Sequence, residues 1–235
     1  MRRLTILSGG AAQGLVTALT SRFTAETGAE IEATYGAVGA MRAKLIGGTP
    51  VDLLILTATL IEELTRSGHV RAGSGHRIGS VETAIAVRSG ALPVAIGNRA
   101  ELSAALSAAD AIYFPDPELA TAGIHFTKVL DALGMREALA GRLKTFPNGN
   151  AAMQAMAAAG GQPIGCTQAT EIIATPGVAL VGPLPGEFRL ATVYTCGVTA
   201  CAREPELAAH MAALLTAPED AENRCSRFGF DLRCS

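Results

Sequence analysis

The sequence predicts an α/β protein in which mainly parallel sheets are flanked by helices. Strand-like and helix-like segments alternate along the 235 residues, an order that is typical of parallel sheets. The run VDLLIL at residues 51–56 is apolar throughout, as in strands that are buried on both faces. Long strands, rather than a flexible linker, join two such sets, so we expect two lobes between which the chain passes twice.

Three strand–helix pairs are expected in the first part of the chain. RLTILS and AEIEATYG are strand-like, and VDLLIL forms the third strand. An apolar helical stripe follows the first strand and stops at Gly28, and a helix over residues 38–46 follows the second. Leu60, Ile61 and Leu64 mark a short third helix.

From about Ser80 the strands become longer. SVETAIAVRSG forms a strand that leads into a stretch punctuated by proline and glycine, and the next strand ends at Pro115. AGIHFTKVLDALG is the clearest helix, because its apolar residues recur on one helical face before a glycine stop. PNGNAAMQAMAAAGG is a second helix that stops at glycine. PIGCTQ, VALVGPLP and RLATVYTCGVTA follow as strands, and two helices finish the chain.

Composition excludes several classes of partner. The formal net charge is −2 and charged residues make up only 17%, so no electrostatic preference for nucleic acid is expected. Aromatic residues are scarce and tryptophan is absent, which leaves no stacking platform for bases or sugars. No apolar run approaches the roughly 20 residues of a membrane-spanning helix, so we do not expect membrane insertion.

The five cysteines leave two interpretations open. Cys196 with Cys201, and Cys225 with Cys234, are candidate disulfides in an oxidising compartment. Alternatively, the cysteines, Cys166 included, are small buried apolar residues and thiols near the chain end. No CxxC is present and neither pair has a histidine at ligand spacing, so we expect no metal site and no cofactor.

Four predicted strand-to-helix junctions carry small residues. Amide groups at a helix start lack intrahelical partners. These free donors and the helix dipole both favour the binding of an anion. An ordinary turn is enough to explain any one junction, and the first junction matches neither a dinucleotide-binding motif nor a phosphate-binding loop. Their repetition favours an anion site. The junctions are Ser8-Gly9-Gly10-Ala11, Gly36-Ala37-Val38-Gly39, Thr121-Ala122-Gly123 and Asn148-Gly149-Asn150.

Three stretches resemble the molybdate-binding proteins of bacterial ABC importers. They are AAQGLVTALTSRFTAETGAEIEATYGAVGAMRAKLIGGTPVDLLI, DPELATAGIHFTKVLDALG and APEDAENRCSRFGF, of which GGTPVDLLI and RFGF are the more specific pieces. The resemblance implies a type 2 periplasmic-binding-protein fold with a ligand cleft between two lobes. Lobe one would comprise residues 1–80 and 192–235, and lobe two residues 81–191, with hinge crossings near 80–87 and 188–195.

The resemblance also implies where the ligand binds. The family holds an oxyanion with hydroxyl groups and backbone amides from these junctions. Ala122 matches the family, whereas Ala11, Val38-Gly39 and Gln168 occupy the positions of expected hydroxyl-bearing residues. Amide side chains are thus prominent, and they suit a carboxylate with further polar groups better than a bare tetrahedral oxyanion. The expected ligand-binding residues are Ser8, Gly9, Gly10, Ala11, Gln13, Val38, Gly39, Arg42, Thr121, Ala122, Asn148, Asn150 and Gln168.

Two titratable residues are candidates for a direct role. Arg42 can pair with a carboxylate through two hydrogen bonds, although it also reads as a solvated helix residue beside Lys44. His125 is expected in the first helical turn beside the anion site, where the helix dipole would depress its pKa and keep it available as a base. The alternative for His125 is a histidine that faces away and merely packs.

The first functional hypothesis is a solute-binding protein that carries a small anion, an oxyanion or a carboxylate, to an ABC permease. The alternative is a cofactor-independent isomerase of a small unsaturated polycarboxylate on the same scaffold, similar to aconitate isomerases, with His125 as its base. A cytoplasmic ligand sensor is a weaker third possibility. No signal peptide is legible, so the chain is expected to be cytoplasmic as written, or periplasmic if it is a processed form.

Overall fold

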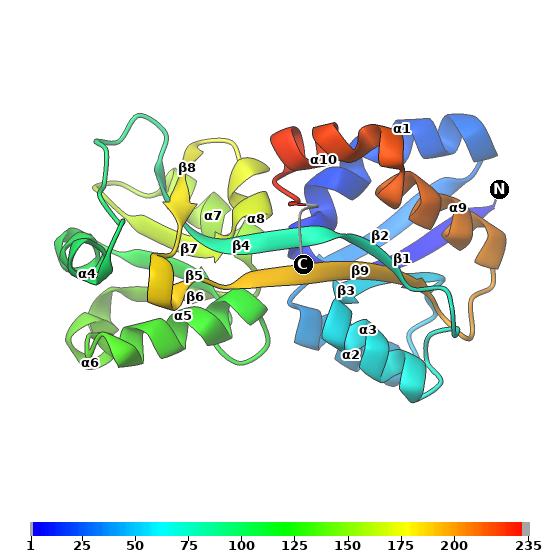
Figure 1. The fold of residues 1–235 in the computed structure, drawn as a ribbon, viewed down its shortest axis with the longest axis horizontal. Coiled ribbons are helices and arrows are strands. Elements are labelled where there is room, and N and C mark those ends of the chain that lie inside the picture. The colour runs from blue at the N-terminus through cyan, green and yellow to red at the C-terminus, as the bar shows by residue number, and fades with distance from the viewer. Residues whose placement is uncertain (1, 232–235) are drawn as a thin grey trace. The chain divides into compact units, whose positions relative to one another are not determined.

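The computed structural model describes residues 2–231, and it divides into two units (Figure 1). Unit 1 comprises the residues up to Ser80 and those from Val193, and unit 2 comprises Val81–Thr192. The strands β4 (His76–Arg88) and β9 (Ala191–Val198) each contribute residues to both units. That these two strands act as hinges stays a prediction.

Unit 1 is built on a sheet with three parallel strands. β1 (Arg3–Gly9) pairs in parallel with both β2 (Glu30–Gly36) and β3 (Leu53–Thr57), and β9 pairs antiparallel with β3. The strand order is β2-β1-β3-β9. The helical segments of this unit are η1 (Gly10–Ala12), α1 (Gln13–Thr27), α2 (Val38–Ile46), α3 (Ala58–Arg66), α9 (Pro205–Thr216), η4 (Pro218–Asp220) and α10 (Ala221–Phe228).

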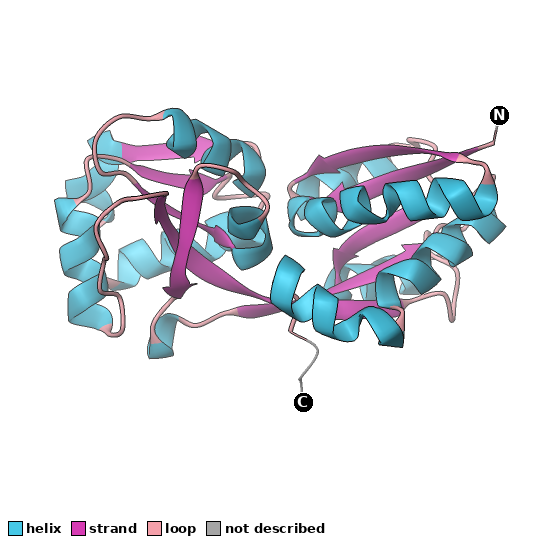
Figure 2. Cartoon of the chain, turned by 90° about the horizontal axis from the view of Figure 1, so that it is seen from above, coloured by secondary structure: helices cyan, strands magenta, loops and turns pink. Residues whose placement is uncertain are grey.

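Unit 2 repeats this plan. β5 (Ile112–Pro115) pairs in parallel with both β6 (Leu143–Phe146) and β7 (Ile164–Gln168). β4 pairs antiparallel with β7 and with β8 (Val178–Pro183). The predicted fold class, mainly parallel sheets flanked by helices, is confirmed (Figure 2). The helical segments here are α4 (Arg99–Ala108), α5 (Thr121–Ala132), α6 (Arg136–Leu139), η2 (Ala140–Arg142), α7 (Gly149–Ala158), α8 (Ala169–Ile173) and η3 (Gly186–Phe188).

The sequence predicts neither α4 nor β6 of unit 2, nor the short helices α6 and α8. α4 lies in the stretch punctuated by proline and glycine. It begins at Asn98, whose side chain accepts a hydrogen bond from the Glu101 amide at 3.0 Å, and it buries Leu102 and Leu106 one helical turn apart. β6 has only four residues, and none of them is fully buried. Its apolar signal is therefore too weak to mark a strand.

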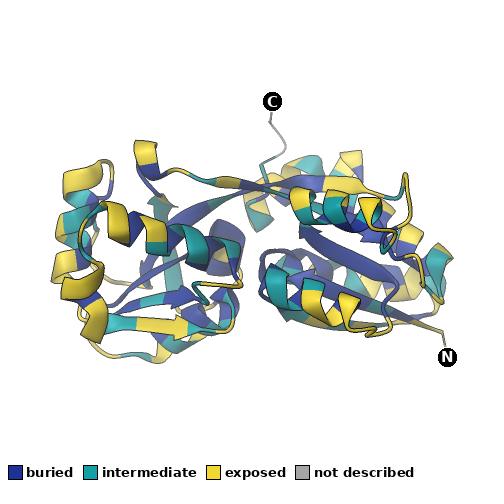
Figure 3. Cartoon of the chain, turned by 90° about the horizontal axis from the view of Figure 1, so that it is seen from below, coloured by how far each residue is buried: buried dark blue, intermediate teal, exposed yellow. Residues whose placement is uncertain are grey.

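A core cluster of unit 2 lies between one face of its sheet and helices that include α4 and α5. Phe114 and Phe126 pack edge to face with ring centroids 5.3 Å apart, and Leu130 and Cys166 belong to the same buried cluster. Most strand residues are buried, whereas the outer faces of the helices are exposed (Figure 3). Burial on one helical face explains why the period of α5 was legible in the sequence.

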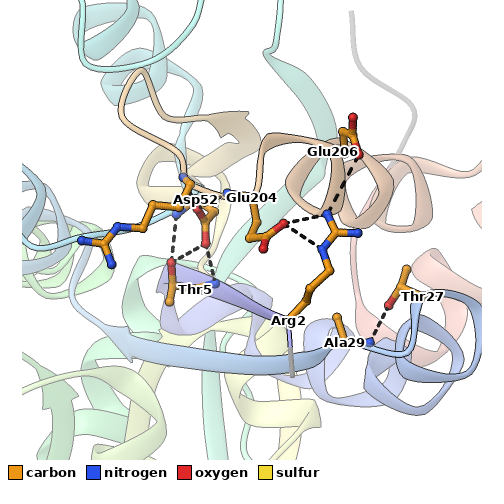
Figure 4. Close-up of polar contacts among 8 residues, drawn as sticks. Arg2, Thr5, Thr27, Ala29, Asp52, Glu204 and Glu206 are labelled. Carbon is orange, nitrogen blue, oxygen red and sulfur yellow. Dashed lines mark hydrogen bonds and ion pairs between the residues drawn. The ribbon is translucent and has the colours of Figure 1, made fainter.

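Asp52 ties three segments of unit 1 together (Figure 4). It lies before β3, at the end of the sheet opposite to the starts of α1, α2 and α3. Its Oδ2 accepts hydrogen bonds from the Thr5 amide at 2.9 Å and the Thr5 hydroxyl at 2.6 Å. Its Oδ1 accepts from the amides of Arg203 at 2.7 Å and Glu204 at 3.0 Å. Burial alone would raise the pKa of Asp52, but these hydrogen bonds lower it below its usual value.

Of the four cysteines that the structure describes, two are buried as small apolar residues, and Cys201 and Cys225 are exposed. Cys166 and Cys196 are buried, and Cys196, Cys201 and Cys225 are all free, so the pairing of Cys196 with Cys201 is not formed. Burial raises the pKa of Cys196 to about 12, which keeps this thiol protonated. Cys234, the candidate partner of Cys225, lies outside the described residues.

Candidate ligand-binding site

In unit 1, three helical segments begin at one edge of the sheet. Because β1, β2 and β3 are parallel, their carboxyl ends meet there, and η1 with α1, α2 and α3 follow them directly. Thr57 caps α3 by accepting a weak hydrogen bond from the Leu60 amide at 3.4 Å. Among the described residues, no side chain caps η1, α1 or α2. The first-turn amides of α2 are therefore oriented toward this edge, and within residues 2–231 the N-cap side chain accepts no hydrogen bond from them.

Gly9 is a glycine because two other residues of this edge approach it closely. A Cβ on Gly9 would lie 2.8 Å from Cγ1 of Val38 and 3.2 Å from Cε1 of Tyr194. Tyr194 pairs with Thr57 across β9 and β3, which places it at the same edge. The glycine expected to clear space for an anion thus also clears space for the start of α2 and for a buried tyrosine ring.

The predicted residues of unit 1 lie together at this edge, with the exception of Arg42. Ser8 is fully buried, and its hydroxyl donates to the Gly9 carbonyl at 2.8 Å. Gln13 begins α1 and is half-buried. Arg42 lies further along α2 and forms an ion pair with Glu63 of α3. A ligand carboxylate would have to compete with Glu63 for this guanidinium group.

In unit 2, α5 begins at the corresponding edge without a side-chain cap within residues 2–231. Its first turn contains Thr121 and the buried Ala122, both predicted ligand-binding residues. Gly123 allows this turn to pack against the end of β5, because a Cβ there would lie 2.1 Å from the Asp116 carbonyl oxygen. The first-turn amides of α5 therefore lie close to the end of β5, where parallel-sheet proteins hold ligands.

The start of α7, at the same edge, differs because the protein supplies its own acceptors. The Asn148 side chain accepts a hydrogen bond from the Ala151 amide at 2.9 Å, and the buried Glu171 carboxylate accepts from the amides of Gly149 and Asn150. Thr167 also donates its hydroxyl to Glu171 at 2.5 Å. Burial raises the pKa of Glu171, and these hydrogen bonds oppose that rise. This junction offers a ligand fewer amides than expected, and ligand binding by Asn148 and Asn150 stays a prediction.

Gln168 ends β7 at this edge and pairs across the sheet with Thr83 of β4. The Gln168 side chain is 3% exposed and Thr83 is fully buried. Neither the Gln168 amide group nor the Thr83 hydroxyl has a hydrogen-bond partner among the described residues. Buried polar groups without partners are unusual in proteins, and they are expected where a ligand completes the hydrogen bonding.

His125 lies in the second turn of α5, because the helix begins at Thr121. Its Nε2 lies 2.7 Å from the carbonyl oxygen of Phe188. A carbonyl only accepts, so this contact places the proton on Nε2 and leaves Nδ1 as the basic nitrogen of the neutral ring. The prediction placed His125 in the first turn, whereas it is the fifth residue of α5 and begins the second turn. Its role as a base stays a prediction.

The described part of the chain contains neither a candidate metal site nor a candidate membrane-spanning helix. It contains no group of three or more histidine, cysteine, aspartate or glutamate side chains that could hold a metal ion. None of its helices is long and apolar enough to cross a membrane.

The sequence matches the family of bacterial extracellular solute-binding proteins over residues 4–231. This chain belongs to that family. The match spans both units and includes every junction described above. The recognition of a solute-binding protein from the sequence is therefore confirmed.

Two solved structures of similar fold bear on this solute-binding protein. The periplasmic molybdate-binding protein of Azotobacter vinelandii has a TM-score of 0.77 and 19% identity, covering 98% of this chain and 100% of that one. A substrate-binding protein of an ABC transporter from Agrobacterium tumefaciens has a TM-score of 0.73 and 15% identity, covering 100% of this chain and 82% of that one. Both confirm the periplasmic-binding-protein fold.

A curated relative has a different name. An aconitate isomerase of Pseudomonas sp is 24% identical over 225 residues, which cover 93% of this chain and 84% of the relative. This solute-binding protein is thus similar in sequence to a protein named for catalysis.

Three residues at the two edges were missed by the sequence analysis. Tyr194 and Thr83 lie on strands that run antiparallel to their neighbours, so only the pairing register brings them to the carboxyl ends of the parallel strands. Glu171 lies in the short segment QATEII, where an acidic residue near a helix start is an unremarkable signal. A signal for Thr83 was present in the sequence, because Thr83 is the polar residue among the alternate residues of β4 from 81 to 87, which are otherwise apolar.

Proposed function

We propose that this solute-binding protein binds a small anion through the main-chain amides of its uncapped helix starts. The observation that carries the proposal is the contrast between capped and uncapped helices at the two edges. α3 and α7 have side-chain acceptors at their starts, whereas α2 and α5 have no side-chain cap in the described structure. Helix amides with their dipole favour a negatively charged group.

Delivery of the anion to an ABC permease is part of this proposal. The relative from Agrobacterium tumefaciens is named as a substrate-binding protein of such a transporter, and the protein from Azotobacter vinelandii is named for molybdate. In this chain Ala11 and Gln168 occupy positions where a hydroxyl was expected. A small carboxylate is therefore favoured over a bare tetrahedral oxyanion. The placement of the ligand between two lobes stays a prediction.

A thermal-shift panel of molybdate, sulfate, hydrogen phosphate, citrate, malate and trans-aconitate tests the proposal. An anion at 100 times its dissociation constant stabilises the folded state by about 2.7 kcal/mol. For a chain of this size, that corresponds to a rise of roughly 5–11 °C in Tm. Failure of every anion in the panel to raise Tm would contradict the proposal.

A substitution at the start of α2 tests whether the anion that raises Tm binds there. In Gly39→Asp, the new carboxylate near the start of α2 takes the place of the anion, so we expect a loss of affinity of tenfold or more. Gly141→Asp is the matched control, because a side chain there has open space and lies in η2, away from the edge. Equal anion affinities for Gly39→Asp and Gly141→Asp would show that the start of α2 does not bind the anion.

Catalysis is a second candidate, favoured by the similarity to the aconitate isomerase. If this protein isomerises trans-aconitate, His125→Ala should lower kcat by about 10²–10⁴-fold, because a positioned base contributes that much. His210→Ala is the control, since this histidine pairs with Glu26 at 2.7 Å on the surface of unit 1. NMR in deuterated buffer would follow product formation and exchange of the substrate protons. Turnover that survives His125→Ala would remove His125 as the base.

A further inference from the structure

Three successive side-chain pairs lie on the face of the unit 2 sheet that α5 covers. Val87 pairs with Ile164 and Ile85 pairs with Cys166, and all four belong to the core cluster that also contains Phe126 of α5. The next pair in the same row joins Thr83 with Gln168. Directly opposed residues of antiparallel strands share a face, so this polar pair continues the apolar row to the edge where α5 begins.

On the opposite face of β7, the polar side chain of Thr167 already has a hydrogen-bond partner within the protein. Thr167 points to that face and donates its hydroxyl to Glu171, whose carboxylate also accepts from the start of α7. Gly149 fits there only because it lacks a Cβ, which would lie 2.0 Å from both side chains. The polar groups on this face of the strand thus find partners within the protein.

The Gln168 side chain keeps both a donor and an acceptor unpaired. Its Nε2 and Oε1 are buried, and neither has a partner in the part of the chain that the structure describes. The hydroxyls of Thr83 and Thr170 are buried and unpaired in the same way. Whichever way the amide group is turned, one nitrogen must find an acceptor and one oxygen must find a donor.

We infer that the site binds a hydroxycarboxylate, whose hydroxyl group donates to Gln168 while its carboxylates accept from amides and hydroxyls. The inference rests on the proposed binding of a small anion. A fully deprotonated anion such as molybdate, sulfate or tricarballylate offers acceptors only, so it supplies no donor to Oε1 of Gln168. A hydroxyl group near a carboxylate satisfies both ends of the amide, with the uncapped start of α5 at the same edge for the carboxylate.

Two pairs of ligands that differ by one hydroxyl group test this inference by titration calorimetry. Citrate should bind at least tenfold more tightly than tricarballylate, and malate at least tenfold more tightly than succinate. In Gln168→Leu the preference within each pair should fall to less than threefold. Thr83→Val should weaken citrate binding severalfold, because it removes one hydroxyl from a fully buried position.

Gln154→Leu is the control for Gln168→Leu, because it makes the same change on an exposed position of α7 in the same unit. It should leave all four affinities unchanged. Without ligand, Gln168→Leu should not lower Tm, since it replaces an unpaired buried amide with an apolar side chain. A lower Tm for this variant would show that Gln168 has partners within the protein, and would overturn the inference.

The outcomes separate the inference from the function on which it rests. Equal binding of citrate and tricarballylate overturns the inference and leaves anion binding intact. Binding of hydrogen phosphate in preference to sulfate, with no response to citrate or malate, overturns the assignment to a carboxylate. If no anion binds at all, the proposed function fails and the inference fails with it.

Discussion

Asp52→Ala is expected to lower the free energy of unfolding by about 3–5 kcal/mol, the largest effect of any single substitution considered for unit 1. The carboxylate accepts four hydrogen bonds from Thr5, Arg203 and Glu204, and three of the donors are backbone amides. Asp52 is only 3% exposed, so water replaces few of these bonds when the carboxylate is removed. Urea unfolding followed by circular dichroism measures the change.

The contribution of Asp52 should depend on pH in a definite direction. Because the pKa of Asp52 is lowered in the folded protein, the stabilisation is complete above the unfolded-state value of about 3.9 and is lost as the pH falls through the folded-state pKa. The difference in stability between the wild type and Asp52→Asn should therefore be constant near neutral pH. It should shrink in the acid range below about pH 4.

Asp131→Ala is the control for Asp52→Ala. Asp131 pairs with Arg136 at 3.2 Å, but both side chains are about half exposed, and such pairs contribute roughly 1 kcal/mol or less. A loss for Asp52→Ala as small as that of the control would contradict the assignment of Asp52 as the link between β1, β3 and the start of α9.

Gly123→Ala should disturb both stability and ligand binding in unit 2. The added Cβ would lie 2.1 Å from the Asp116 carbonyl oxygen and 2.4 Å from that of Pro115, and backbone atoms cannot rotate away. The first turn of α5 must then move from the end of β5. We expect a loss of about 3 kcal/mol in the free energy of unfolding. Because the amides of Thr121 and Ala122 move with that turn, the affinity for the anion should fall at least tenfold.

Gly160→Ala provides the matched comparison for Gly123→Ala. It makes the same change in unit 2, at a position where an added Cβ meets nothing within 4 Å. Its stability should stay within about 0.5 kcal/mol of the wild type, and its anion affinity should be unchanged. If Gly123→Ala instead retained the wild-type affinity, the start of α5 would be excluded from the binding site.

Local patterns predicted the parts of the fold whose signals are local. The spacing of apolar residues reports α5 directly, because one face of that helix is buried. The glycine stop at Gly28 reports the end of α1, because the cap there has a positive φ. β6 is short and half-exposed, so its residues carry no comparable pattern. The helix starts at the two edges were predicted as well, since small residues after a strand are a local signal.

The partners of these helix starts were beyond the reach of local patterns. Asn148 was expected to face a ligand, but its side chain caps its own helix. The carboxylate of Glu171, from the following helix, accepts hydrogen bonds from the neighbouring amides of Gly149 and Asn150. Gln168 was predicted, whereas Thr83 was not, because 85 positions separate two residues that only the register of β4 and β7 brings together. Which amides remain available is therefore decided by tertiary contacts.

The discontinuous composition of unit 1 has a consequence for synthesis on the ribosome. Unit 2 is one uninterrupted stretch, Val81–Thr192, so all of it has emerged before translation of the last segment ends. Unit 1 still lacks β9, whose residues pair with β3, and the amides before α9 that bind Asp52. The nascent chain can therefore complete the second unit while the first waits for its final strand, the reverse of the usual order from the N-terminus.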